Sequence, residues 1–139
     1  YEPPRGGEVF ISVNDGDKRN ITAIARSIAR LGFSLVATTG TARALRASGI
    51  ECEEVGKIHA GSHTILDRIA SGEIVLMINT PFGSSTNTDG YEMRAACVRH
   101  GVSYCTTLAG AQALIAGMEA VRETGLDVIA LQDLPQWEG

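Results

Sequence analysis

The hydrophobic positions along the chain follow two alternating patterns. Short runs rich in β-branched and aromatic residues predict strands at residues 8–13, 33–38, 50–55, 73–79 and 102–105, and 128–131 is compatible with a short edge strand. Apolar residues three and four positions apart predict helices at residues 21–31, 42–47, 61–71, 91–100 and from 108 to 118 or beyond. Because strands and helices alternate, we expect a three-layer α/β/α fold of Rossmann type. Its five-stranded, mainly parallel sheet should carry helices on both faces.

Turn residues and apolar content refine this expectation. Asp15 or Asp17 should cap the start of the first helix, and Gly32 should end that helix in a left-handed conformation. The most apolar run, 73–79, should lie in the centre of the sheet. A long polar loop is expected at 80–90, and loops of this length are typically functional or mobile.

Composition limits the class of protein. The chain has 139 residues, of which 44% are hydrophobic and 20% charged, which is enough for one core. We interpret residues 1–7, with two prolines and two glycines, as a linker and residues 8–139 as a single domain. The formal net charge of −4 gives no support to a nucleic-acid partner. No apolar run reaches the roughly 18 residues of a membrane span.

The cysteines and histidines predict neither a metal site nor a nucleophile. Cys52, Cys97 and Cys105 are widely spaced, so reduced thiols in a cytoplasmic protein are the simplest interpretation. No neighbouring base accompanies Cys105 in the sequence. His59 and His63 lie four residues apart, but a glycine between them disrupts a common helix face.

Hydroxyl groups and glycine gather where predicted strands end. Thr38, Gly40 and Thr41 stand between a strand and a helix, and Thr106 and Thr107 stand before the last helix. The carboxyl ends of parallel strands meet at one edge of a sheet, and ligands bind there. Free amides and the helix dipole make such a helix start suitable for an anion.

The two lysines point to the same edge. Lys18 follows the first strand and Lys57 the third, whereas the chain contains ten arginines. Flexible ammonium groups beside hydroxyls and free amides predict a monophosphate site. Asn79 ends the 73–79 strand and Thr80 follows it; both can face a base or ribose, and the Asn79 amide can both donate and accept. Taken singly, the Thr38–Thr41 stretch is more typical of a helix cap and turn, each lysine is more typical of a surface charge, and Asn79 is also typical of a turn.

Several short motifs together resemble a known family. Those shared with the methylglyoxal-synthase-like superfamily are Ser12-Val-Asn-Asp-Gly-Asp-Lys18, Leu31-Gly-Phe33 and Ala37-Thr-Thr-Gly-Thr-Ala42. Those that resemble its branch in the allosteric domain of carbamoyl-phosphate synthetase large chains are Lys57-Ile-His59-Ala-Gly61, Asp67-Arg68-Ile69, Gly72-Glu73, Ile78-Asn79-Thr80, Arg94, Tyr104 and Thr106-Thr107-Leu108. The resemblance covers about residues 8–120.

The resemblance implies a nucleoside monophosphate effector, with UMP as inhibitor and, in some bacteria, IMP as activator. Residues that would hold its phosphate are Lys18, Thr38, Gly40, Thr41 and Lys57. Residues that would face its base or ribose are Asn79, Thr80 and Thr107, and those toward the rest of the protein are Tyr104 and Thr106. Pro81, Ser84 and Ser85 depart from the enteric pattern, so the choice of effector and a response to ornithine stay open.

The resemblance also implies that the isolated domain is not an enzyme and holds no metal or cofactor. The parent chain would be an ATP-dependent, glutamine-hydrolysing ligase of pyrimidine and arginine biosynthesis, with ATP and Mg²⁺ or Mn²⁺ bound in its other domains. Expected partners are the remainder of the large chain, a glutaminase small chain and further copies of the parent in a homo-oligomer.

Two other classes of function stay open. A lyase of the methylglyoxal synthase type, which acts on dihydroxyacetone phosphate, needs a carboxylate base beside the phosphate site. The corresponding stretch, Ala60-Gly61-Ser62, has no carboxylate, and Asp67 should face elsewhere. The third class is an interaction module whose helix cap binds anions incidentally.

Overall fold

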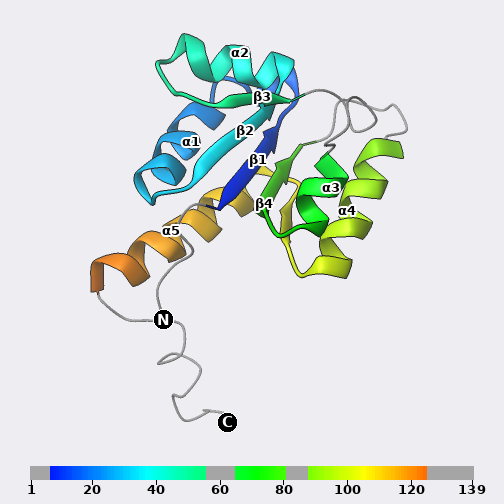
Figure 1. Cartoon of the computed structure of the whole chain (residues 1–139). Helices are drawn as coiled ribbons and strands as arrows, with labels where there is room; N and C mark the ends of the chain where they lie inside the picture. The colour runs from blue at the N-terminus through cyan, green and yellow to red at the C-terminus, as the bar shows by residue number, and fades with distance from the viewer. Residues whose placement is uncertain (1–6, 56–64, 81–87, 125–139) are drawn as a thin grey trace.

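The computed structural model describes residues 7–55, 65–80 and 88–124 (Figure 1). The strands are β1 (Glu8–Ser12), β2 (Ser34–Thr38), β3 (Glu53–Val55), β4 (Ile74–Asn79) and β5 (Ser103–Cys105). The helices are α1 (Ile21–Arg30), α2 (Thr39–Ala47), α3 (Ile65–Ala70), α4 (Thr88–His100) and α5 (Leu108–Thr124), with a 3₁₀ turn, η1, at Asp15–Asp17. The described helices include none that is long and apolar enough to cross a bilayer.

The strands form one sheet in the order β3-β2-β1-β4-β5, and all four neighbouring pairs are parallel. The predicted five-stranded α/β/α fold is therefore confirmed. The prediction that strand 73–79 is central was wrong, because β1 is the middle strand and β4 lies between β1 and β5. Strand order reverses at β1, since the chain builds β2 and β3 on one side of it and β4 and β5 on the other.

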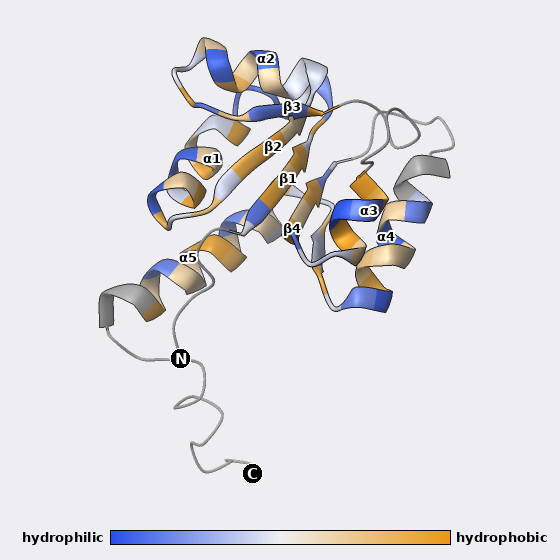
Figure 2. Ribbon diagram, viewed as in Figure 1, coloured by the Kyte–Doolittle hydropathy of each residue, from blue (hydrophilic) through white to orange (hydrophobic). Residues whose placement is uncertain are grey.

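Helices cover both faces of the sheet, and each face has its own apolar core. Side chains of α1, α2 and α5 pack on one face around Val9 and Ile11, whereas α3 and α4 cover the other face around Phe10 and Met77. Strands β1, β2 and β4 are accordingly mostly hydrophobic in Figure 2, whereas the edge strand β3 is hydrophilic. Alternate residues of β1 thus serve opposite cores, as expected for a strand buried on both sides.

The turn after β1 differs from the prediction. Neither Asp15 nor Asp17 caps α1, because the turn forms its own 3₁₀ segment, in which Asn14 Oδ1 accepts the Asp17 N–H at 2.9 Å. Helix α1 begins only at Ile21. The predicted end of α1 is confirmed: Gly32 has a φ of +100°, a conformation that L side chains rarely adopt.

Several element limits also shift. Strand β3 is shorter than predicted, because the Ile50 N–H is used by the Leu45 carbonyl in the end of α2 and the Ile50 side chain turns into a core. Helix α4 begins at Thr88, so the stretch expected as a loop at 80–90 ends in helix. The expected strand at 128–131 lies outside the described residues.

Arg68 of α3 joins three elements at the amino ends of the strands. Its Nη1 donates to Glu8 Oε1 of β1 at 3.0 Å, and its Nη2 donates to Glu53 Oε2 of β3 at 2.6 Å. The Arg68 side chain is only 12% exposed and the Glu8 side chain 20%. Removing one partner would leave a poorly hydrated charge, so loss of Arg68 should cost more than loss of one partner of a surface pair.

Arg68→Met should lower the free energy of unfolding by about 1–3 kcal/mol, because Glu8 and Glu53 lose their shielded partner. The matched control is Arg46→Met, since the Arg46–Glu54 pair is 50% and 42% exposed and should contribute about 0–1 kcal/mol. Urea denaturation measures both. Equal losses in the two variants would contradict the special role of Arg68.

Candidate functional site

The carboxyl ends of β1, β2 and β4 meet at the point where the strand order reverses. Ser12, Thr38 and Asn79 are the last residues of these strands, and α2 begins immediately after β2. In open parallel sheets this switch point is the usual place for a ligand. The structure therefore brings most of the predicted site residues to one edge of the sheet.

Two threonine hydroxyls hold the turn that follows β1. Thr41 Oγ1 accepts the Val13 N–H at 3.1 Å, and Thr80 Oγ1 accepts the Asn14 N–H at 2.9 Å. Both threonines are buried, each 1% exposed. Thr41 and Thr80 thus support the turn that carries the site, because their oxygens already accept hydrogen bonds from its backbone.

The start of α2 carries no side-chain cap. Thr38, the N-cap residue, has extended backbone and makes no capping hydrogen bond; its Oγ1 instead donates to Ser12 Oγ at 3.0 Å. The next two residues, Thr39 and Gly40, are exposed. Among the described residues the Thr38 side chain thus leaves the first amides of this nine-residue helix uncapped, and the helix dipole favours an anion there.

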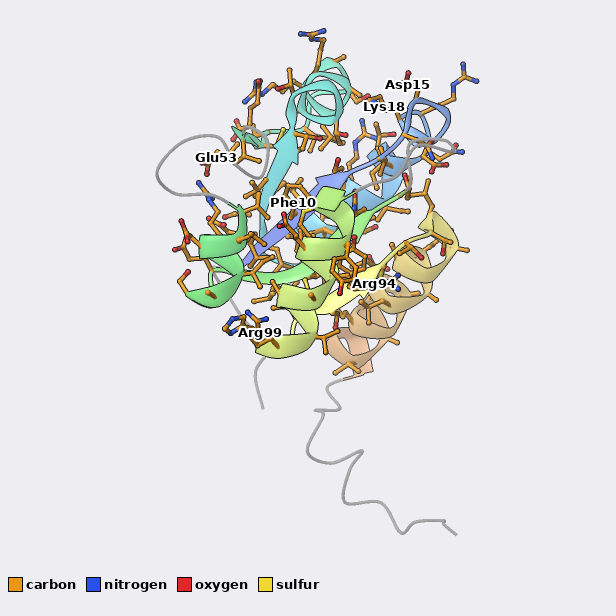
Figure 3. The ribbon with its side chains drawn as sticks, turned by 90° about the vertical axis from the view of Figure 1, so that its right-hand side faces the viewer. Phe10, Asp15, Lys18, Glu53, Arg94 and Arg99 are labelled. Carbon is orange, nitrogen blue, oxygen red and sulfur yellow. The ribbon has the colours of Figure 1, made fainter. Side chains whose placement is uncertain are left out.

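Lys18 brings a positive charge to this helix start. Its Nζ donates to the Val13 carbonyl at 3.1 Å and to Asp15 Oδ1 at 2.7 Å, and the two side chains lie together in the turn after β1 (Figure 3). A β-carbon built on Gly40 would lie 3.3 Å from Lys18 Cε and 3.6 Å from Nζ. Gly40 therefore leaves room for the close approach of the lysine, which a methyl group would push back by a few tenths of an ångström; it is not required by an unusual φ, since position 40 is helical.

Asn79 and Tyr104 form a second polar group at the ends of β4 and β5. Asn79 Nδ2 donates to the Tyr104 hydroxyl at 2.8 Å. The Arg94 guanidinium of α4 lies over the Tyr104 ring, 5.3 Å from its centroid. A residue predicted to face the ligand thus contacts a residue predicted to face the rest of the protein.

The other predicted site residues are Thr106 and Thr107, just before α5, and Lys57. Thr107 caps α5, because its Oγ1 accepts the Gly110 N–H at 3.0 Å, so the start of α5 does not repeat the uncapped arrangement of α2. Thr106 is half-buried in the turn before α5. Lys57 lies outside the described residues.

The described thiols are unsuited to nucleophilic chemistry. Cys52, Cys97 and Cys105 are all free. Burial raises the pKa of each thiol, and raises that of Cys97 to about 11. A neutral thiol is a weak nucleophile at neutral pH. Within the described ranges no three His, Cys, Asp or Glu side chains are placed to share a metal ion, and His59 and His63 lie outside those ranges.

A cleft of about 760 Å³ opens elsewhere, between α1 and the segment that leads into β3. It is lined by Arg26 and Arg30 and by residues 33–35 and 49–53. It contains none of the predicted site residues. This cleft lies where β2 starts, away from the carboxyl ends of the strands.

Comparison with known sequences agrees with this geometry. Residues 20–106 match the sequence profile described as the MGS-like domain. The chain belongs to the MGS-like domain family. It is 49% identical over 135 residues to the carbamoyl phosphate synthase large chain, C-terminal section, of Methanopyrus kandleri. It is 42% identical over 130 residues to the carbamoyl phosphate synthase large chain of Myxococcus xanthus.

These alignments cover nearly all of this MGS-like domain but little of the relatives. They include 96% and 94% of the chain, against 25% and 12% of the two relatives. The resemblance to the C-terminal region of carbamoyl-phosphate synthetase large chains is thereby confirmed.

Solved structures show the same fold at low sequence identity. Methylglyoxal synthase from Elizabethkingia anophelis has a TM-score of 0.62 and 18% identity, covering 81% of this chain and 78% of that chain. The structure of ForH has a TM-score of 0.62 and 20% identity, covering 89% and 84%. These likenesses concern the fold of the MGS-like domain and carry no activity with them.

Sequence reasoning did not single out Ser12, Asp15 and Arg94 as parts of this site. All three belong to the family-like motifs, but only the fold places the side chains of Ser12 and Arg94 beside Thr38 and Tyr104. The spacing of Asp15 from Lys18 was a signal in itself, because residues three apart in a 3₁₀ turn lie above one another.

Gly40→Ala should weaken binding of inorganic phosphate by roughly two- to threefold, because the new methyl group pushes Lys18 back from the start of α2 by a few tenths of an ångström. The free energy of unfolding should stay equal or rise by up to about 1 kcal/mol, since alanine favours helix. Gly117→Ala in α5 is the matched control, as nothing lies within 4 Å of its β-carbon position. Unchanged phosphate binding in Gly40→Ala, measured by calorimetry, would contradict the close approach.

Proposed function

We propose that this MGS-like domain is the regulatory domain of a carbamoyl-phosphate synthetase large chain and binds a nucleoside monophosphate effector. The observation that carries the proposal is the Lys18 ammonium group beside the uncapped start of α2. A phosphate monoester matches this arrangement, because it can accept from free amides and pair with the lysine at the same time. UMP, an inhibitor, and IMP, an activator, are the expected ligands.

The second polar group supports a role for the rest of the nucleotide. Asn79 is 6% exposed and borders the switch point next to Ser12, its partner in the β1–β4 pairing. Its amide can meet a base or a ribose hydroxyl, and its bond to Tyr104 fixes its orientation. Tyr104 and Arg94 would then pass a change at the ligand to the outer surface of α4.

Regulation requires the rest of the protein, of which this chain corresponds to a small part. The effector would prefer one arrangement of the domain against the catalytic body, and couplings of this kind typically amount to about 1–3 kcal/mol. The parent would be a cytoplasmic, ATP-dependent and glutamine-hydrolysing ligase that works with a glutaminase small chain. ATP and its metal ions would bind outside this domain.

Lys18→Met should weaken binding of UMP by about tenfold or more, since a charge-assisted contact to the phosphate is lost. Calorimetry with UMP, IMP and inorganic phosphate measures the change. Arg19→Met is the matched control, because it removes the same charge from the adjacent, exposed position. If Lys18→Met binds all three ligands like the unchanged chain, the proposed phosphate site is wrong.

An assay for methylglyoxal formation from dihydroxyacetone phosphate separates this proposal from the lyase alternative. No turnover is expected. Asp67 is exposed on α3, which covers the other face of the sheet from α2. The hydrogen bond from Lys18, together with its charge, lowers the pKa of Asp15, which makes that carboxylate a weak base. Turnover that disappears in Asp15→Asn would favour the lyase.

A further inference from the structure

Lys18 already has an anionic partner in the structure. Its Nζ lies 2.7 Å from Asp15 Oδ1, three residues earlier in the η1 turn. The same Nζ faces the start of α2, where the proposed phosphate would bind. A phosphate and the Asp15 carboxylate therefore compete for one ammonium group.

The two partners of this ion pair differ strongly in how firmly they are held. The Lys18 side chain is 22% exposed, and its Nζ is also bonded to the Val13 carbonyl, at 3.1 Å. The Asp15 side chain is 98% exposed. Asp15 can consequently swing into water while Val13 keeps the ammonium group in place.

We propose that Asp15 is the counter-ion that an effector phosphate displaces from Lys18, and that Asp15 thereby lowers the affinity of the domain for its effector. The inference rests on the proposed function, because it requires phosphate at Lys18. Exchange of one anion for another keeps the ammonium group neutralised throughout. Only a ligand whose phosphate contacts Lys18 has to break the Asp15–Lys18 ion pair, so only such a ligand loses affinity through it.

Thermodynamics gives the expected size of the effect. When only a fraction of molecules is competent to bind, the apparent dissociation constant equals the intrinsic constant divided by that fraction. An ion pair with an exposed partner, such as Asp15–Lys18, is weak, because water and salt screen it. Loss of Asp15 should therefore tighten phosphate binding by a small, measurable factor. The lowered pKa of the Asp15 carboxyl is consistent with this pairing.

Asp15→Asn should bind UMP and inorganic phosphate about two- to fivefold more tightly than the unchanged chain, as measured by calorimetry. Uridine, which lacks the phosphate, should show no such gain. Asp17→Asn is the matched control: it removes the same charge from the same turn, and the structure records no ion pair between Asp17 and Lys18 among the residues it describes. Its affinity for UMP should change less than twofold.

A double-mutant cycle then tests the route of the effect. In the Lys18→Met background, Asp15→Asn should leave UMP binding unchanged, because the two substitutions act on one pair. Equal gains in affinity in Asp15→Asn and Asp17→Asn would overturn the counter-ion role alone. So would an Asp15→Asn variant that binds UMP no more tightly than the original chain, provided that the original chain binds UMP. Absence of UMP and phosphate binding in every variant would overturn the proposed function itself.

Discussion

The candidate site depends on two backbone amides that the sheet itself cannot satisfy. Beyond the last residue of β1 the chain leaves the ladder, and the N–H groups of Val13 and Asn14 need new acceptors. The hydroxyls of Thr41 and Thr80 provide them, one from α2 and one from the end of β4. The turn that carries the lysine is therefore fixed by segments that lie 28 and 66 residues away in sequence. An unpaired buried amide costs about 1–3 kcal/mol, so this arrangement is strongly favoured.

This constraint changes how the threonines of the site are understood. Thr41 was expected to hold phosphate; in the structure its oxygen supports the backbone and its side chain is buried. A change at Thr41 would therefore disturb the turn as well as any ligand. Thr38, half-buried and bonded to Ser12, lies nearer the surface, and Lys18 and Gly40 form the part that a ligand can reach.

Much of the fold could be predicted because the apolar periods of strands and helices differ. The same reasoning placed Lys18 and Gly40 at one edge, since parallel strands end together. Side-chain partners were harder to foresee, because Asp15 can cap a helix or pair with a lysine and only the local 3₁₀ turn decides between them. The limits of β3 depended on a competing use of the Ile50 amide by the end of α2. The hydrophobic pattern of residues 50–55 does not indicate that the Ile50 N–H is used by the helix and not by the sheet.

The ion pairs of Arg68 lie at the opposite end of β1 from the lysine. The four steps of about 3.3 Å from the first to the last residue of β1 place the two edges about 13 Å apart. Substitutions at sites this far apart that share no partner usually have additive effects on stability. Substitutions around Arg68 can consequently change the thermal stability of this domain without changing its affinity for a ligand at Lys18, and the reverse also holds.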